Sequence, residues 1–242
     1  MKSVMKSVLS CLFVLGLLFA ATAQGQDKEK KSDDKKSDTK KSDEKKGDDK
    51  KGDDKKGDDK KDPTKDKTTE YYPLKEGMTW TYKSGDKSFT VKVAGTDKKG
   101  DPTVSCSRLE TRNSKGELIA TEHIAIKEDG VYRYAFENSD AKPPLRFLKL
   151  PVDTSEKTWK FDSKIGGQDV KGTFKMATEK DSVKIGAKEY KDVISVSCEE
   201  VPIDNQKVAL TYYFAPKVGM IRQVVDVAGA KVTIELEKVG EK

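Results

Sequence analysis

Residues 78–95, MTWTYKSGDKSFTVKVAG, alternate apolar and polar side chains on both sides of a Ser-Gly-Asp break. The apolar members of the two segments share one face: Trp80, Tyr82, Phe89, Val91 and Val93. A period of two residues is typical of a half-buried antiparallel strand, and Gly and Asp favour tight turns. This stretch therefore predicts a β-hairpin with one apolar and one polar face.

The same alternation recurs to the end of the chain. It is clearest in KTWKFDS (157–163), DVISVSCEE (192–200) and KVTIELEKV (231–239). Turn-forming residues separate the alternating segments, at 84–86, 99–101, 114–116, 129–130, 165–167 and 228–229. No window of about 12 residues carries a helical stripe, and KPPLRFLKL (142–150) is the one place where a short helix is expected to intrude. Residues 71–242 are therefore predicted to be all-β, with ten or eleven strands.

Three landmarks occur twice in the same order, which predicts two tandem units at about 71–137 and 147–227, followed by a C-terminal strand at 230–239. The landmarks are a Trp-centred strand, a Val-Ser-Cys strand and a hairpin that begins with Gly: Trp80 and Trp159, Cys106 and Cys198, and Gly130 and Gly219. The Trp-to-Cys spacing is 26 residues in the first unit and 39 in the second, so one connection is longer in the second unit. Chance similarity is the alternative to duplication, since all strands favour similar residues.

A sheet of this size with one continuous apolar face has to close on itself, fold over or be covered. Otherwise the apolar face would stay in contact with water. The expected fold is therefore a curved antiparallel sheet, half-barrel or barrel-like, whose concave face can line a cavity.

The first 23 residues are predicted to be a cleaved signal peptide. Lys2 and Lys6 provide a positive start, residues 8–20 are mostly apolar, and small residues at 21 and 23 favour a cut before Gln24. A membrane-spanning helix is the alternative, but it would need about 20 apolar residues. The mature chain is therefore expected to be exported, either periplasmic or secreted, with no membrane span.

Residues 24–70 are predicted to be a disordered tether. From Lys30 the chain repeats Lys-Lys-(Ser or Gly)-Asp plus one more polar residue, and residues 27–69 contain no aliphatic or aromatic side chain. Folding would bury nothing to offset an ordering entropy of about 1–2 kcal/mol per residue. A soluble spacer is the simplest role, and weak adhesion to a charged envelope polymer is the alternative. The net charge of +6 is distributed among interleaved acids and bases, which argues against nucleic-acid binding.

The sequence predicts no catalytic residue, no cofactor or cofactor-binding residue, and no metal ligand. His123 is the only histidine, and it is expected to be exposed because Ile124 and Ile126 take the buried face of its strand. No Ser, Cys or carboxylate stands at a recognisable triad or metal spacing from it. The acidic residues lie in turns or on polar faces, where solvation explains them. These features argue against an enzyme.

Two cysteines lie beyond the predicted signal peptide, Cys106 and Cys198, and both are expected on the apolar side of their strands. A disulfide and two buried free thiols both stay open, because a bridge needs Cα atoms about 4.4–6.8 Å apart. The aromatic residues are expected to pack the core, with lining of a ligand pocket as the alternative: Trp80, Tyr82, Tyr132, Tyr134, Phe136, Trp159, Phe161, Tyr212 and Phe214.

Two short motifs carry a family resemblance: YYPLKEGMTWTY at 71–82 and YYFAPKVGMIRQV at 212–224. This pair resembles a pattern in uncharacterised exported bacterial proteins and lipoproteins. The resemblance implies a curved antiparallel sheet similar to the half-barrels of periplasmic lipoprotein carriers, and it implies no catalytic residues. The chain departs from many such proteins because Cys11 precedes most of the apolar run, so it offers no usable site for lipid attachment.

Together these features favour a non-enzymatic exported β-domain that binds an apolar or amphipathic ligand, or an envelope polymer or protein, on its concave face. The alternative is a structural or protein-interaction module of the cell envelope with a filled core, and an unrecognised hydrolase is third. A cavity of about 300–1,000 Å³ would favour the ligand binder, and a filled interior would favour the interaction module.

Overall fold

The computed structural model describes residues 69–203 and 206–240. The predicted signal peptide and the tether up to residue 68 lie outside the described residues. Thr69 and Glu70, at the end of the predicted tether, contact the folded domain: Thr69 bridges to Tyr72, and the Glu70 carbonyl accepts a hydrogen bond from the Lys217 amide at 2.6 Å.

The described residues form fourteen strands. In the first half these are β1 (Thr79–Ser84), β2 (Lys87–Lys99), β3 (Val104–Asn113), β4 (Leu118–Lys127), β5 (Gly130–Phe136) and β6 (Ser139–Lys149). In the second half they are β7 (Thr158–Ile165), β8 (Gln168–Thr178), β9 (Val183–Ile185), β10 (Lys188–Tyr190), β11 (Ile194–Ile203), β12 (Gln206–Ala215), β13 (Gly219–Val227) and β14 (Ala230–Gly240).

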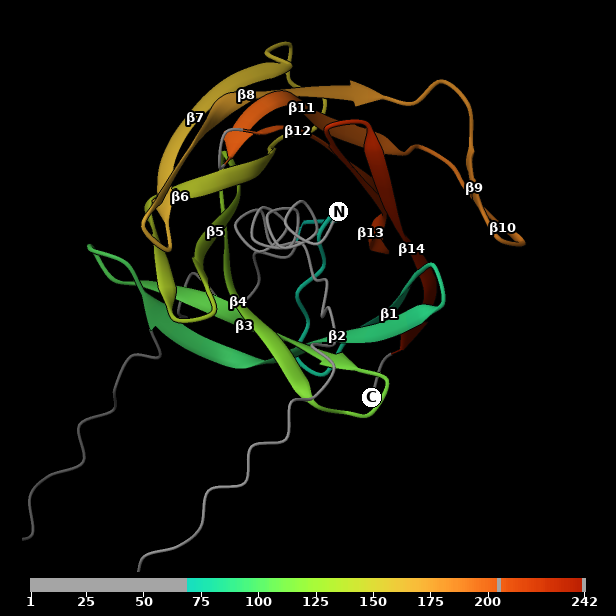
Figure 1. The fold of residues 1–242 in the computed structure, drawn as a ribbon, viewed down its shortest axis with the longest axis horizontal. Coiled ribbons are helices and arrows are strands. Elements are labelled where there is room, and N and C mark those ends of the chain that lie inside the picture. The colour runs from blue at the N-terminus through green and yellow to red at the C-terminus, as the bar shows by residue number, and fades with distance from the viewer. Residues whose placement is uncertain (1–68, 204–205, 241–242) are drawn as a thin grey trace, which may run out of the picture.

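Twelve of the strands close into an antiparallel barrel in the order β1-β14-β13-β12-β11-β8-β7-β6-β5-β4-β3-β2 (Figure 1). The prediction of an all-β antiparallel domain is confirmed. The half-barrel form and the number of ten or eleven strands are wrong: β1 pairs with β14, so the described sheet has no open side at that junction. Closure pairs the edge strands and hides the apolar face at the same time.

The strand order is the same in two six-stranded halves. Each half begins with its Trp-centred strand, and each of the next five strands pairs with the one before it. The sixth strand also pairs with the first strand of the other half. In this order, β1 to β6 correspond to β7, β8, β11, β12, β13 and β14. The hairpin β9–β10 is the addition that makes the second half longer, and it projects beside the barrel in Figure 1. Duplication of the sequence stays an interpretation, and this shared order is compatible with it.

The predicted turns all lie between paired strands. In the first hairpin, Trp80 pairs with Val91 and Tyr82 with Phe89, so the predicted apolar face forms as a set of cross-strand neighbours. The short helix expected at 142–150 is absent, because residues 142–149 belong to β6. Two consecutive prolines disfavour the helical backbone, and the buried Leu145 and Phe147 follow the period of a strand.

The core follows the inward faces of the strands. Trp80 and Trp159 are 4% and 5% exposed, so neither Trp side chain is left in solvent. At one end, Tyr72 from the segment before β1 packs edge-on against Phe147 of β6 and Phe214 of β12, with ring centroids 5.4 and 6.0 Å apart. This segment therefore ties together strands from both halves.

The two motifs of the family resemblance pack against each other. The Trp80 indole Nε1 donates to the Val218 carbonyl at 2.6 Å, and the Tyr82 hydroxyl donates to the Met220 carbonyl at 2.9 Å. These carbonyls precede the β13–β14 ladder, which runs from Arg222 to Val227. Gly219 lies between them with φ +93°, and a Cβ there would stand 3.5 Å from the Trp80 ring nitrogen. The aromatic motif thus satisfies backbone acceptors that the sheet leaves unpaired.

The cysteines lie in different clusters and both are free thiols. Cys198 belongs to the main core, whereas Cys106 packs in a separate cluster with Ala125 and Tyr134. Both cysteines are buried among apolar side chains, as predicted, but not in the same cluster. Of the two open alternatives the structure has the buried free thiols. Cys106 pairs with Asp97 of β2, on the outer side of the wall.

Both thiols are expected to resist alkylation in the native protein. Burial raises the pKa of Cys106 and of Cys198 to about 11. At pH 8 the thiolate fraction falls at least about 100-fold below that of a cysteine with the ordinary pKa of about 8.5. Iodoacetamide labelling followed by mass spectrometry checks this, with the urea-unfolded chain as the fast control. Rapid labelling of either residue in the folded protein would contradict the burial described here.

Candidate functional site

The barrel wall is broken between β6 and β7. Across the described strands these two pair only at Ala141 with Ile165 and at Lys142 with Lys164. Each strand stays paired on its other side, β6 with β5 and β7 with β8. The facing edges of 143–149 and 158–163 therefore diverge from each other.

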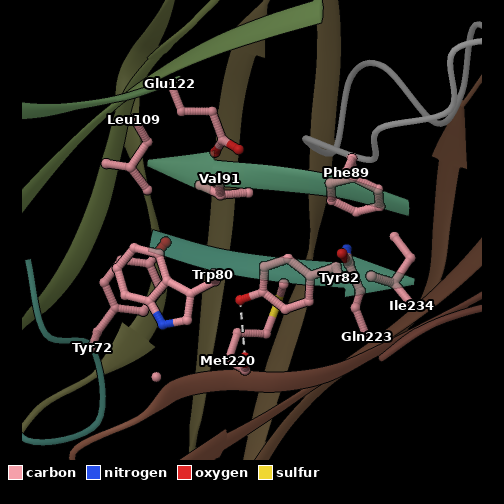
Figure 2. Close-up of a pocket in the computed structure, with 11 residues that line it drawn as sticks. Tyr72, Trp80, Tyr82, Phe89, Val91, Leu109, Glu122, Met220, Gln223 and Ile234 are labelled. Carbon is pink, nitrogen blue, oxygen red and sulfur yellow. Dashed lines mark hydrogen bonds between the residues drawn. The ribbon is translucent and has the colours of Figure 1, made fainter. Parts of the chain in front are cut away.

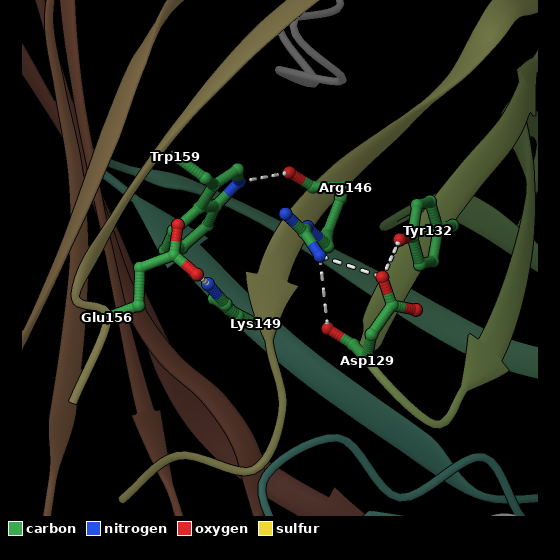
Figure 3. A network of polar contacts seen from close by, with 6 residues as sticks. All are labelled: Asp129, Tyr132, Arg146, Lys149, Glu156 and Trp159. Carbon is green, nitrogen blue, oxygen red and sulfur yellow. Dashed lines mark hydrogen bonds and ion pairs between the residues drawn. The ribbon is translucent and has the colours of Figure 1, made fainter. Parts of the chain in front are cut away.

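Side chains of β7 bridge the break. The Trp159 indole Nε1 donates to the Arg146 carbonyl at 2.9 Å, and the Ser163 hydroxyl donates to the Pro143 carbonyl at 2.7 Å. Figure 3 shows the first of these bonds from β7 to β6. Pro143 and Pro144 have no backbone N–H, which reduces the donors that the free edge of β6 presents.

A hollow of about 300 Å³ follows this break and is called the wall groove below. Its lining residues come from the β4–β5 turn, β5, β6 and β7: Asp129, Tyr132, Pro143, Pro144, Leu145, Arg146, Trp159, Lys160, Phe161, Asp162 and Ser163. Two basic and two acidic side chains are among them, so the groove carries no formal net charge. It combines aromatic, proline and arginine surface, which is typical of sites that bind proteins.

One end of the wall groove is held by a polar network (Figure 3). The Asp129 carboxylate accepts from the Tyr132 hydroxyl at 2.5 Å and from Arg146 Nη1 at 2.7 Å. The Arg146 guanidinium lies 6.0 Å from the Tyr132 ring centroid and 5.8 Å from that of Trp159. Nearby, the Lys149 ammonium pairs with Glu156. Arg146 is thereby fixed between two aromatic rings, and this pre-orders the groove surface.

The network shifts two pKa values in opposite directions. Burial by itself would raise the pKa of Asp129, but the hydrogen bond from Tyr132 and the charge of Arg146 outweigh it and leave the pKa below its ordinary value. Burial, together with the hydrogen bond to Asp129, raises the pKa of Tyr132 to about 12. The network is therefore complete at neutral pH, with an ionised carboxylate and a neutral phenol.

Acid is expected to weaken this network. Because the folded pKa of Asp129 is depressed, its contribution to stability is present above the unfolded pKa of about 3.9 and is lost as pH falls through the folded value. Asp129 is largely exposed, so the contribution is at most about 1 kcal/mol, or about 3 °C in Tm. Comparing Tm at pH 6 and pH 3 for the unaltered chain and Asp129→Asn checks this. The drop on acidification should be smaller in the variant, and an equal drop would show that Asp129 does not contribute.

A small cavity lies inside the barrel (Figure 2). Its volume is about 50 Å³, and it is lined by Tyr72, Trp80, Tyr82, Phe89, Val91, Leu109, Glu122, Gly219, Met220, Gln223 and Ile234. Gln223 is 3% exposed, and its amide Nε2 has no hydrogen-bond partner among the described residues. A volume of this size holds a few water molecules or the end of a ligand, and is well below the 300–1,000 Å³ of ordinary ligand pockets.

A buried ion pair lies beside the cavity. Arg133 donates through Nε and Nη2 to one oxygen of Glu122, both at 2.8 Å, and its guanidinium lies 5.5 Å from the Phe147 ring centroid. Burial would lower the pKa of Arg133, but the Glu122 carboxylate outweighs it and raises the pKa above the ordinary value. Sequence reasoning missed this pair. The signal was present, because Glu122 shares the inward period of Ile124, and Arg133 that of Val131.

His123 is not exposed, and this prediction is wrong. Its strand position is opposite Arg108, on the outer face, yet the residue is only 5% exposed. Asp97 of β2 and Arg108 of β3 cover it, and His123 Nε2 lies 2.9 Å from the Asp97 carboxylate. The hydrogen bond with His123 lowers the pKa of Asp97. Residues of β2 and β3 bury the His123 side chain, so the alternation of residues along β4 alone could not predict its burial.

The predicted aromatic residues are found in the main core, at the interior cavity, in the outer cluster and at the wall groove. Most pack the main core, and Trp80 and Tyr82 also line the cavity. Tyr132 and Tyr134 join the outer cluster around Cys106. Tyr132, Trp159 and Phe161 line the wall groove. Sequence reasoning did not single out the groove, because it depends on where two strands of different halves separate.

Two negative findings apply to residues 69–203 and 206–240. No group of three or more His, Cys, Asp or Glu side chains there could hold a metal ion. Likewise, no helix in these ranges is long and apolar enough to cross a membrane.

Comparison with known proteins gives two distant structural matches. No family model matches the chain, and no curated protein matches it. A candidate lipoprotein from Parabacteroides distasonis is 11% identical with a TM-score of 0.45, covering 71% of this chain and 99% of its own. A candidate exported protein with a YmcC-like fold from Bacteroides fragilis is 9% identical with a TM-score of 0.37, covering 72% of this chain and 100% of its own. Because both TM-scores are below 0.5, the fold described above rests on the strand pairing of this chain.

Proposed function

We propose that this chain is an exported, non-enzymatic interaction module that binds an envelope partner in the wall groove. The observation that carries the proposal is the broken β6–β7 junction, with a groove of about 300 Å³ along it. The proposed export rests on the predicted signal peptide, and the predicted tether would let the barrel reach a partner away from the export site.

The lining of the groove supports protein binding. Tyr132 and Arg146 are of residue types that contribute strongly to protein interfaces. The Asp129 carboxylate and the buried Trp159 ring hold Arg146 in place. The absence of formal net charge among the lining residues disfavours a polyanionic partner.

In-cell photo-crosslinking tests the proposal. A benzoylphenylalanine at position 160, which is exposed and lines the groove, should form a protein adduct in the cells that produce the chain. The same probe at Lys231, exposed on β14, is the matched control and should form none. Arg146→Ala should reduce the adduct at position 160 several-fold. Equal crosslinking at both positions, or none at position 160, would overturn the proposal.

The interior cavity favours a second candidate function, binding of an apolar or amphipathic ligand. The cavity joins an apolar lining to the Gln223 amide and the Glu122 carboxylate, and such polar groups fix ligand orientation in apolar pockets. Its volume of about 50 Å³ makes this the weaker candidate. Native mass spectrometry of protein purified from its own host tests it: a retained small molecule that is lost in Leu109→Trp would support this function, and bare protein would reject it.

A further inference from the structure

In the second half of the barrel, a hairpin packs beside a stretch where two neighbouring strands do not pair. There, β13 pairs with β14 only from Arg222 onward, so Gly219 to Ile221 separate from β14. The hairpin β9–β10 lies next to this place, since Arg222 Nη2 donates to the Lys184 carbonyl at 2.8 Å. Just after the hairpin, the Asp192 carbonyl accepts from the Tyr71 hydroxyl at 3.0 Å, which ties this connection to the segment before β1. An extended segment thus accompanies the break in this half.

The hairpin docks by its apolar side chains. Ile185 is 6% exposed and belongs to the main core, and Val183 and Tyr190 pack against that core. The hairpin also provides a backbone acceptor at Lys184, which Arg222 binds from the outer face of β13. The hairpin therefore docks by apolar side chains on one face, together with a barrel side chain that donates to one of its backbone carbonyls. Pockets for alternate side chains and bonds to the peptide backbone are also what extended peptides use when they bind β-proteins.

The first half has a break and no hairpin. By the shared strand order, β5-β6-β7 correspond to β13-β14-β1, and the connection from β2 to β3 corresponds to the one that holds β9–β10. The first connection is only residues 100–103, and Gly100 lies against Tyr134 of β5. The two breaks are not at the same ladder, since one is between β13 and β14 and the other between β6 and β7. However, one break lies among β5, β6 and β7 and the other among β13, β14 and β1, which are corresponding sets of three neighbouring strands.

From this comparison we infer that the wall groove takes an extended polypeptide segment of another protein, a strand or hairpin with β-branched and aromatic side chains on one face. This inference rests on the proposed function and names its partner class. Tyr132, Pro143 and Pro144 offer the surface that would receive those side chains. The unpaired edges of 145–149 and 158–163 offer the backbone groups that Trp159 and Ser163 do not already bind. The neutral groove suits a neutral apolar face better than a charged polymer.

A graft tests the inference in the full chain. Residues 179–193, which carry the hairpin, replace the turn 100–103, so that the first half gains the segment that the second half already has. The matched control is the same insert with Val183, Ile185 and Tyr190 replaced by serine. Hydrogen–deuterium exchange is then measured at the backbone amides of 145–149 and 158–163.

The apolar insert should slow exchange in both edges at least about 10-fold, as expected for groups that enter a stable hydrogen-bonded unit. The serine insert should leave exchange as in the unaltered chain. Equal exchange with the two inserts would overturn the inference. A second experiment tests for a glycan, by saturation-transfer NMR of the unaltered chain with chitohexaose. Saturation transfer that is abolished by Tyr132→Ala, together with no protection by the graft, would mean that the groove binds a glycan. That result would also overturn the inference.

The graft and the crosslinking experiment can fail separately. Crosslinking at position 160 asks whether the groove has a partner in cells, whereas the graft asks which chemistry fits the groove. Protection by the graft without any adduct would keep the inference about fit and reject the function.

Discussion

Replacing Arg133 with methionine is expected to lower the free energy of unfolding by about 3–5 kcal/mol. The change keeps much of the side-chain volume but leaves Glu122 buried without its counter-charge, and removing one partner of a buried pair costs this much. Both residues lie on the inward face, and the two hydrogen bonds at 2.8 Å are lost together. Urea denaturation followed by circular dichroism measures the change.

Two further variants identify the cause. Arg112→Met removes a pair with the same 2.8 Å separation from Glu110 on the surface, and it should cost less than about 1 kcal/mol. The double variant Glu122→Leu/Arg133→Met removes both buried charges and should recover most of the stability, since apolar replacements of buried pairs are often neutral. A double variant as unstable as Arg133→Met alone would mean that shape, and not the uncompensated charge, sets the cost.

Replacing Trp80 with alanine is expected to lower the free energy of unfolding by about 3–5 kcal/mol as well. The change empties a large volume in the core and also removes the hydrogen bond to the Val218 carbonyl. Trp80 connects β1 to the start of β13, so the substitution should destabilise both motifs. The shift of the urea midpoint, with Trp159 as the remaining fluorophore, measures it.

Trp80→Phe separates the two contributions. It keeps most of the apolar contact and removes the indole donor, so it should cost about 1–3 kcal/mol, the penalty for a buried acceptor without a partner. Hydrogen exchange at the start of β13 should increase in this variant and stay unchanged around β7. A Trp80→Phe protein as stable as the unaltered chain would show that the 2.6 Å contact contributes little.

Much of the fold was predictable because strand patterning is local. The alternation around Trp80 and Tyr82 predicted both the hairpin and its inward face, and the Gly and Asp breaks predicted the turns. The prediction failed for residues 142–150, where the absence of clear alternation was taken to allow a helix. Pro143 and Pro144 lie inside β6 and interrupt its alternation of polar and apolar residues, while Leu145 and Phe147 are still buried.

The sequence by itself determined an all-β domain, the hairpin turns and which faces of most strands are apolar, since neighbouring residues alone specify these features. Tertiary structure decided closure of the sheet, the burial of His123 beneath Asp97, the placing of Cys106 on the outer side, and the wall groove. Each of these depends on which distant strands become neighbours and where their registers shift. Bulges and separated edges arise when twisted strands close into a barrel. The alternation of apolar and polar residues along one strand does not specify where they occur.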